Sequence, residues 1–395
     1  MRKVRTVWKA KAGVFLTTAA VILIPLRLCS VADSGSVRVP VPTGPYPVGT
    51  FTMRLVDLNR MDPYVQDGSK RELMVRFWYP AGNRQGCAPA EYTSPKVWGY
   101  MSLLLGMQAQ PRTNSCWQAL PLEGMHPLIV ASHGYTGMFT DYTFLFEDLA
   151  SRGYVVVSVA HTHETTAVEF PGGELRTSRV GSIFVDQTPL ADDRSLHFAE
   201  AVRFEDLRFV AAEMARVNSG SGLLAEKLDL TRMGVLGHSM GADTALGVLA
   251  RGGDFKVGVL LDAIEVSRDS QARSNKPVLL VSEGRVNWSE SECAIWNHLS
   301  GPRSAIVFRG AEHLTPTDAI WLGDAVPDLR VKAGRMGVAK TISAIRDSVA
   351  DFFDRYLASR SVPSLHDRFL TDSPDALVTL QEQSLCATSA ERLGK

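Results

Sequence analysis

The stretch MGVLGHSMGADTALGVL, residues 233–249, decides the fold of this chain. Its apolar opening, Met233–Leu236, predicts a buried strand, and its closing part, Ala242–Leu249, predicts a helix. Between them lies Gly237-His238-Ser239-Met240-Gly241, a G-x-S-x-G pattern. Between a strand and a helix this pattern is typical of a tight turn that raises the serine hydroxyl above the sheet. Ser239 is therefore a candidate nucleophile, with Gly237, His238 and Gly241 as the other parts of its turn.

Apolar runs on both sides of this stretch predict further strands, at 128–131, 154–160, 257–261, 277–282 and 304–308. Continuous runs are typical of strands covered on both faces, as in a parallel sheet. Helical patterns alternate with them, at 141–152, 197–217, 241–251 and 339–358. Two earlier segments, 51–58 and 72–79, alternate apolar and polar residues as antiparallel strands do. The order predicts one α/β domain with a mostly parallel, doubly wound sheet and helices on both faces.

The composition is that of a globular protein. The chain has 395 residues, 45% of them hydrophobic, and 42 basic residues balance 42 acidic ones. Zero net charge leaves no electrostatic footprint for nucleic acid, and the 21% charged residues argue against a multi-span membrane protein.

The first residues resemble a secretory signal peptide. A basic stretch, residues 2–11, precedes an apolar run at 13–26, and Ser30-Val31-Ala32 supplies small residues for cleavage. We expect a signal peptide over 1–32, a single domain over 33–360 with an insertion at about 80–125, and a tail over 361–395. Secretion is the expected localisation, and an uncleaved N-terminal membrane anchor is the alternative.

Export changes how the cysteines are interpreted. Cys87, Cys116, Cys293 and Cys386 form an even set in an oxidising compartment, which favours disulfides over metal or redox chemistry. We favour the pairs Cys87–Cys116 and Cys293–Cys386 among the three connectivities. No spacing of these cysteines matches a zinc site, and no metal or other cofactor is expected.

A nucleophilic serine needs a base and an orienting acid, which follow it in this type of fold. His313 is the best-placed base, because it follows the predicted strand 304–308, whereas His298 falls in a predicted helix and His366 in the tail. Two acids end predicted strands, Asp262 and Glu283, and topology leaves the choice between them open.

Three blocks of the sequence carry a family resemblance: Gly237–Gly241, Leu261-Asp262-Ala263 and Arg309–His313. Together with Thr43–Gly49 and the segment from His126 to Gly134, they resemble the secreted, lipoprotein-associated type of platelet-activating-factor acetylhydrolases and their bacterial relatives. These belong to the α/β-hydrolase superfamily. In that family the acid lies 23 residues after the nucleophile, as Asp262 does after Ser239. The resemblance therefore implies Asp262 as the acid and Glu283 as a neighbouring structural acid.

An oxyanion hole is expected from two backbone N–H groups, those of Met240 and Tyr135. Met240 follows the nucleophile, and Tyr135 follows His133-Gly134 after the strand 128–131. The Tyr135 ring is also a candidate wall for an acyl pocket.

Other features have several interpretations. The apolar segment 97–107 suits a cap over the site, a peripheral surface that meets lipid or polymer, or ordinary core packing. Phe170 and Phe184, in the long connection 162–196, are available to line a substrate cleft. His161 and His163 could point to one side, but no third ligand is spaced to complete a metal site.

We interpret the chain as a secreted serine hydrolase that cleaves carboxylic esters through a Ser239–His313–Asp262 triad. The resemblance implies short acyl esters as substrates, such as the acetyl ester of an ether phospholipid. The alternatives are a secreted lipase or polyester hydrolase, an acyltransferase on the same triad and, disfavoured, a non-catalytic extracellular binding protein.

Overall fold

The computed structural model describes residues 37–180, 193–263, 273–282, 290–308, 310–334, 337–362 and 376–380. The predicted signal peptide, Phe184, Glu283, His366 and Cys386 lie outside these ranges. Within them, no helix is both long and apolar enough to cross a bilayer.

The main element is a mixed sheet that has eleven strands among the described residues, in the order β13-β12-β11-β10-β9-β5-β6-β2-β1-β4-β3. Its centre is parallel, from β12 through β9 and β5 to β6. The predicted hairpin at one side is antiparallel, with β1 paired to β2 and β2 to β6. The strands are β1 (Val48–Met61), β2 (Lys70–Pro80), β3 (Pro89–Glu91), β4 (Arg112–Trp117), β5 (His126–Ser132), β6 (Val155–Ala160), β9 (Leu228–His238), β10 (Phe255–Leu261), β11 (Val278–Ser282), β12 (Arg303–Phe308) and β13 (Ala376–Leu380).

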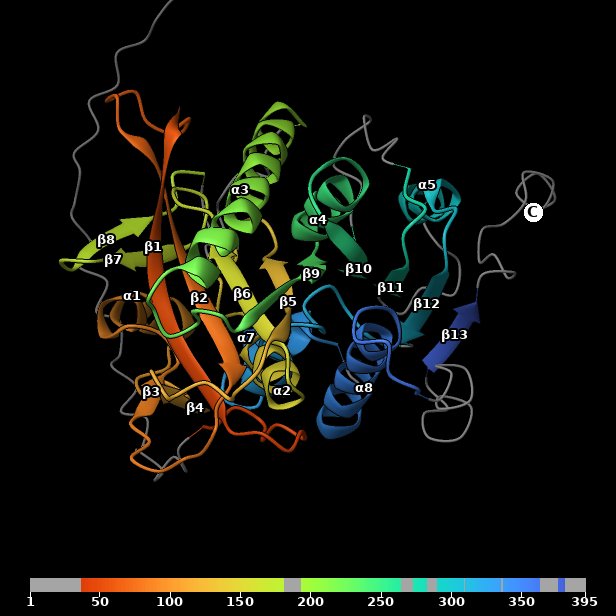
Figure 1. Cartoon of the computed structure of the whole chain (residues 1–395), viewed down its shortest axis with the longest axis horizontal. Helices are drawn as coiled ribbons and strands as arrows, with labels where there is room; N and C mark the ends of the chain where they lie inside the picture. The colour runs from red at the N-terminus through yellow and green to blue at the C-terminus, as the bar shows by residue number, and fades with distance from the viewer. Residues whose placement is uncertain are drawn as a thin grey trace, which may run out of the picture. The chain divides into compact units, whose positions relative to one another are not determined.

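Helices cover both faces of this sheet (Figure 1). Successive strand residues point to opposite faces, as β5 shows: Leu128 and Val130 pack in one core cluster, and Ile129 and Ala131 in the other. The first cluster includes α3 (Asp193–Ser219), α4 (Met240–Arg251) and α5 (Glu290–His298), and the second includes α2 (Thr143–Ser151) and α8 (Val338–Tyr356). The predicted α/β fold with a mostly parallel sheet is confirmed.

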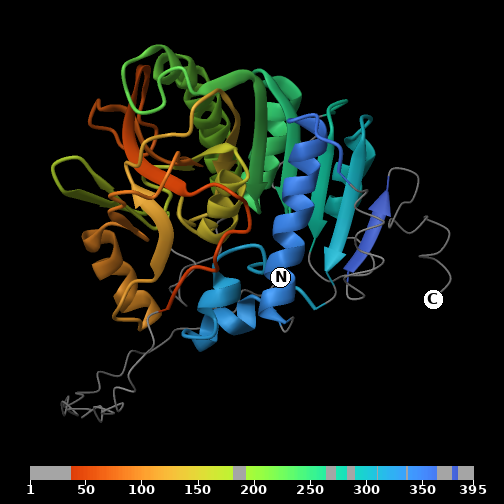
Figure 2. The ribbon, with the colours of Figure 1, turned by 60° about the horizontal axis from the view of Figure 1, so that its bottom comes forward.

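Several elements escaped the sequence prediction. They are α1 (Pro95–Leu105), α6 (Ala319–Leu322), α7 (Pro327–Lys332) and the hairpin of β7 (Ala167–Phe170) and β8 (Glu174–Thr177), besides β3 and β4. The segment predicted as a tail contains β13, which pairs antiparallel with β12 at the edge of the sheet (Figure 2). Among the elements that escaped prediction, β3, α6 and α7 span six residues or fewer, which are too few to display a helical or strand period.

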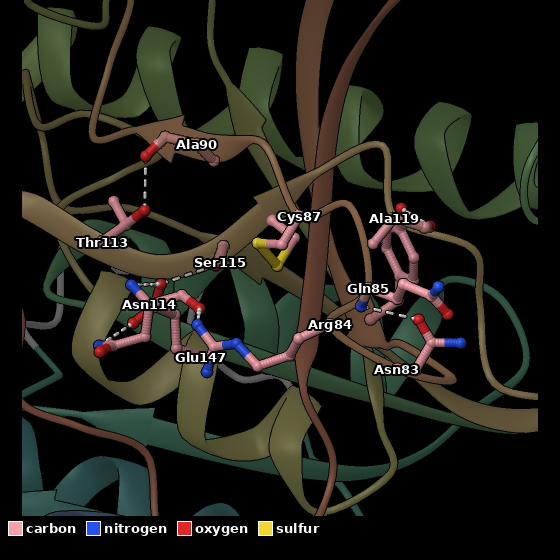
Figure 3. Close-up of a disulfide and its surroundings, with 12 residues drawn as sticks. Asn83, Arg84, Gln85, Cys87, Ala90, Thr113, Asn114, Ser115, Ala119 and Glu147 are labelled. Atoms are coloured by element: carbon pink, nitrogen blue, oxygen red, sulfur yellow. Dashed lines mark hydrogen bonds between the residues drawn. A yellow bond between two sulfur atoms is a disulfide. The ribbon is translucent and has the colours of Figure 1, made fainter.

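The predicted insertion at about 80–125 folds as β3, α1 and β4, and a disulfide joins Cys87 to Cys116 across it (Figure 3). Ser94 begins α1 by accepting a hydrogen bond from the Val97 N–H, and Gly106 ends it in the left-handed conformation. β4 is also tied to α2, because the buried Glu147 carboxylate accepts hydrogen bonds from Asn114 and Ser115. Cys293 is disulfide-bonded as well, but Cys386 lies outside the described residues, so the Cys293–Cys386 pair stays a prediction.

Candidate active site

Ser239 stands at the turn between the end of β9 and the start of α4. Its backbone has φ 55° and ψ −127°, a combination that few non-glycine residues adopt and that is typical of functional turns. The turn requires glycine at both flanks. A Cβ on Gly237 would lie 1.9 Å from the Gly241 carbonyl oxygen, and one on Gly241 would lie 2.3 Å from the Ser132 carbonyl oxygen.

Two further candidate residues meet Ser239 at this edge of the sheet. Asp262 follows β10, the strand next to β9, and His313 follows β12. The His313 Nε2 atom lies 3.0 Å from Ser239 Oγ, and its Nδ1 atom lies 2.5 Å from Asp262 Oδ2. Of the other candidates, His298 lies at the end of α5, and Glu283 and His366 lie outside the described residues.

The protonation state of His313 follows from its partners. A carboxylate can only accept, so Nδ1–H donates to Asp262, and in the neutral ring Nε2 then accepts from the Ser239 hydroxyl. In this tautomer the lone pair of Nε2 can accept the serine proton. Ser239 is 4% exposed, whereas the His313 side chain is 42% exposed, so the imidazole borders solvent while the hydroxyl is enclosed.

The loop after β5, residues 133–136, lies directly against Ser239. A Cβ on Gly134 would come within 3.4 Å of the Ser239 Cβ. Tyr135, whose N–H is a candidate oxyanion donor, borders the same cavity as Ser239. Met240, the other candidate donor, is the first residue of α4, at the helix end where N–H groups favour negative charge.

The side chains of a buried ion pair form hydrogen bonds with the backbone of this loop. Arg203, on α3, donates to the carbonyl oxygens of His133 and Gly134, the latter at 3.0 Å. Its Nε donates to the Glu164 carboxylate at 2.7 Å, and Glu164 accepts from the Thr136 N–H at 3.3 Å. Arg203 and Glu164 are fully buried. Neither was a candidate in the sequence, where each is an ordinary charged residue far from any motif.

The Arg203 contact also orients the next peptide. No described peptide bond is cis, and in a trans peptide the C=O and the following N–H point in opposite directions. Because the Gly134 carbonyl points at Arg203, the Tyr135 N–H points away from this buried pair.

A cavity of about 560 Å³ opens beside Ser239. Trp98, Met101 and Leu105 of α1 border it, as do Leu322 of α6 and Leu329 of α7. The segment 97–107, for which three interpretations were open, therefore contributes to the wall of this cavity. Its packing could not be inferred from the sequence, because it depends on how the insertion folds back over the sheet.

Phe170 does not line this cavity, contrary to expectation. It is 3% exposed and packs with Met74, Phe139, Ala160 and Val168 in a small core cluster. The hairpin of β7 and β8 places it there, and the Arg176 guanidinium covers its ring. His161, which was considered for a metal pair, instead donates from Nδ1 to the Asp206 carboxylate at 3.0 Å.

Among the described residues, His238, Asp262 and His313 have ligand-type atoms within 4.8 Å of one another. These atoms are engaged in hydrogen bonds: His313 with Asp262 and Ser239, and His238 with the His313 carbonyl oxygen and the Tyr142 hydroxyl. The arrangement suits proton transfer, and a metal would have to break it.

Comparison with known proteins identifies the family of this chain. The family model described as "Platelet-activating factor acetylhydrolase, isoform II" matches residues 31–180 and 218–360, more than half of the chain. A probable 1-alkyl-2-acetylglycerophosphocholine esterase of Arthroderma benhamiae is 24% identical over 264 residues, which cover 61% of this chain and 63% of the relative. The platelet-activating factor acetylhydrolase of Bos taurus is 24% identical over 328 residues, which cover 72% of this chain and 69% of the relative.

Among solved structures, a ferulic acid esterase from Streptomyces cinnamoneus superimposes with a TM-score of 0.72 at 31% identity. The match covers 87% of this chain and 99% of that one. The chain therefore belongs to the platelet-activating factor acetylhydrolase, isoform II, family, and it has the α/β-hydrolase fold.

Proposed function

We propose that this protein hydrolyses carboxylic esters with Ser239 as nucleophile, His313 as general base and acid, and Asp262 as the orienting acid. The position of His313 is the observation that carries the proposal, since its Nε2 lies 3.0 Å from Ser239 Oγ and its Nδ1 lies 2.5 Å from Asp262 Oδ2. Membership of an acetylhydrolase family supports the same reaction.

The chemistry follows from these contacts. Ser239 Oγ attacks the ester carbonyl carbon while His313 Nε2 takes the hydroxyl proton, and Asp262 stabilises the imidazolium that forms. The N–H groups of Met240 and Tyr135 stabilise the negative oxygen of the tetrahedral intermediate. His313 then protonates the departing alkoxide, and a water activated by the same imidazole hydrolyses the acyl-enzyme and releases the acid.

For the substrate, we propose a short acyl ester, such as the acetyl ester of an ether phospholipid, acted on outside the cell. The family and the two relatives named as acetylhydrolase or alkyl-acetylglycerophosphocholine esterase support this choice. The N-terminal sequence and the Cys87–Cys116 disulfide support export, because disulfides persist in oxidising compartments.

The cavity favours a second candidate, an ester with a bulky aromatic or apolar group. A volume of about 560 Å³ exceeds what an acetyl group fills, and the wall carries Trp98, Met101 and Leu322. The structural neighbour named as a ferulic acid esterase, at 31% identity, supports an aromatic acyl group.

One panel separates these candidates. We would measure kcat/KM for p-nitrophenyl esters from acetate to palmitate and for a feruloyl ester, with Ser239→Ala as the blank. A short-acyl enzyme should show a maximum at about two to four carbons, because each further buried CH₂ gains about 0.8 kcal/mol only where a pocket is open to receive it. A feruloyl ester that exceeds acetate would favour the aromatic substrate.

The same panel, extended to emulsions, polymers and an added alcohol, tests for a lipase, a polyester hydrolase and an acyltransferase. Rates that rise to palmitate with activation on emulsions would indicate a lipase, and good turnover of an aromatic polyester would indicate a polyester hydrolase. An ester product formed when an alcohol acceptor is added would indicate an acyltransferase. A protein inactive throughout, and unlabelled by an organophosphonate, would overturn the proposed function.

A further inference from the structure

We propose that His238 and Tyr142 are positioning residues. Through one series of hydrogen bonds they join the loop at residues 133–136, the turn that carries Ser239 and the loop that carries His313. This inference rests on the proposed function. Three contacts form the series: Gly134 N to Tyr142 Oη at 3.2 Å, Tyr142 Oη to His238 Nδ1 at 2.8 Å, and His238 Nε2 to the His313 carbonyl oxygen at 2.8 Å.

The direction of each hydrogen bond can be deduced from its acceptor. The His313 carbonyl oxygen can only accept, so His238 Nε2 carries a proton and donates it. Burial and the neighbouring His313 lower the pKa of His238 to about 3, so the ring is neutral and its Nδ1 is an acceptor. The Tyr142 hydroxyl therefore donates to Nδ1, and its oxygen accepts from the Gly134 N–H.

These hydrogen bonds connect three segments that are far apart in sequence. Gly134 directly precedes Tyr135, the candidate oxyanion donor, in the loop after β5. His238 directly precedes Ser239 at the end of β9, and His313 lies in the loop after β12. A shift of any one of these loops would stretch one of the hydrogen bonds. The hydrogen bonds therefore fix the positions of the oxyanion donor, the nucleophile and the base relative to one another.

The surroundings leave the two side chains little freedom. Tyr142 and His238 are each 2% exposed. The His238 ring lies against the His313 ring, with centroids 4.7 Å apart, and against the Tyr142 ring at 5.6 Å. At Gly134 the backbone approaches so closely that a Cβ there would lie 3.0 Å from His238 Nδ1. Packing and hydrogen bonds thus hold the imidazole in one orientation.

His238 does not compete with His313 as the base. Both of its nitrogens are engaged, one with a carbonyl oxygen and the other with a phenol, and neither is hydrogen-bonded to Ser239 among the described contacts. Its role is to hold His313 from the backbone side, while Asp262 holds the same residue through the ring.

The first test replaces Tyr142 by Phe, which removes the hydroxyl and keeps the ring. We expect kcat to fall about 10- to 100-fold, the cost of misplacing reacting groups by a fraction of an ångström to one ångström, with KM changed less than threefold. Tyr79→Phe is the matched control, because it removes another buried tyrosine hydroxyl, bonded to the Ala119 carbonyl at 2.6 Å away from the site. The control should keep the wild-type kcat.

The second test compares His238→Gln with His238→Leu. Glutamine supplies one acceptor and one donor about as far apart as the two ring nitrogens, so it should retain at least about tenfold more kcat than leucine, which supplies neither. The acidic limb of the pH profile of kcat should keep its midpoint in His238→Gln, because His238 does not titrate in the cycle. Tyr142→Phe and His238→Leu should be strongly non-additive, since either one breaks the same series of hydrogen bonds.

Melting temperatures separate positioning from folding. If His238→Leu does not fold, Tyr142→Phe and His238→Gln still test the positioning role. A Tyr142→Phe protein with the kcat of Tyr79→Phe, or a shifted pH midpoint in His238→Gln, would overturn the positioning role. Retained activity in Ser239→Ala would instead overturn the proposed function, and the two failures are thereby distinguished.

Discussion

Ser239 holds a backbone conformation that costs about 1–3 kcal/mol, and such strain persists only where the surroundings impose it. Here the constraint comes from Gly237 and Gly241, which leave no room for side chains, and from the bond between the Ser239 N–H and the Leu261 carbonyl oxygen at 3.0 Å. Asp262 also has a positive φ, 44°, at the end of the neighbouring strand. Both unusual conformations occur at residues to which we assign chemistry.

For these residues we predict that Ser239→Ala and His313→Ala each lower ester turnover by at least about 10³-fold, because removing either group disables proton transfer to the nucleophile. Labelling by an organophosphonate and steady-state rates measure this. Asp262→Asn should lose far more kcat than Glu283→Gln. The reverse ranking would show that the acid follows the other strand.

A second prediction concerns Asp141, which borders the cavity. Burial, reinforced by the nearby Asp318 charge, raises the pKa of Asp141 to about 7, against about 3.9 in an unfolded chain. Between these values the folded state binds more protons than the unfolded state, so the free energy of unfolding should fall as pH rises from about 4 to 7. Asp141→Asn should remove this loss and be more stable than the wild type at pH 8 by roughly 1–3 kcal/mol.

Denaturant unfolding at several pH values measures the difference, which should shrink towards pH 4. The exposed Asp324→Asn is the matched control, because it removes the same charge from a solvated side chain that is 69% exposed. Equal behaviour of the two variants at all pH values would contradict the burial argument.

Helix α3 carries Arg203, which hydrogen-bonds the loop at residues 133–136. A second arginine on the same helix shows how burial changes the contribution of a charged pair to stability. Arg203 is fully buried with Glu164, whereas Arg208, on the same helix, pairs with Glu205 at the surface, with side chains 51% and 47% exposed. Removing one partner of a buried pair leaves an uncompensated charge, whereas a surface pair is worth little.

We therefore predict that Arg203→Met lowers the free energy of unfolding by about 3–5 kcal/mol, and that Arg208→Met lowers it by less than about 1 kcal/mol. Chemical denaturation of both variants gives the values. Replacing Arg203 and Glu164 together by Met and Gln should cost less than the Arg203→Met change alone, because no buried charge then remains unpaired. A larger loss in the double variant would show that loop packing, and not the charge, dominates.

The Cys87–Cys116 disulfide closes a loop that contains α1, and α1 borders the cavity. In the chain-entropy model, a link between residues separated by 29 positions stabilises the folded state by about 3–4 kcal/mol. We predict a loss of this size for Cys87→Ser with Cys116→Ser, together with a lower kcat/KM, because Trp98 and Met101 lose their anchorage.

Unfolding by denaturant and the ester panel measure the two effects. Each single variant should cost nearly as much as the double variant, since either one removes the link. If each single variant instead lost about half the stability lost by the double variant, and the two losses were additive, the cysteines would contribute only by packing.

Over the whole chain, charge is balanced and the helices on both faces of one sheet bury two core clusters. The N-terminal segment stands apart in composition, with a basic start, an apolar run and small residues before Asp33. This is the composition of a signal peptide, a type of segment that is cleaved off on export.

We accordingly predict that the protein recovered from the medium of an exporting host begins at Asp33. Mass spectrometry of the intact protein and of its N-terminal peptide measures this, and peptide mapping without reduction tests the Cys293–Cys386 pair at the same time. A membrane-bound product that retains residues 1–32 would favour the N-terminal anchor.

The sequence by itself determined the fold class, because buried strands, amphipathic helices and the G-x-S-x-G turn are signalled by residues that are neighbours in the chain. It also placed Ser239 and His313 each directly after or shortly after a strand of the parallel sheet, whose carboxyl ends bring loop residues to one edge. Strand order alone left the choice between Asp262 and Glu283 open, because it does not say which carboxylate reaches the imidazole.

Only the tertiary structure decided which ordinary residues surround the nucleophile. Tyr142 and His238 are 96 positions apart, and Arg203 lies 69 positions from Gly134, yet both pairs are hydrogen-bonded. Nothing in the local pattern marks a tyrosine before a helix or an arginine inside one. Their roles come from burial, which removes water as an alternative partner and makes each unpaired polar group costly, so the folded chain must bring matching groups together.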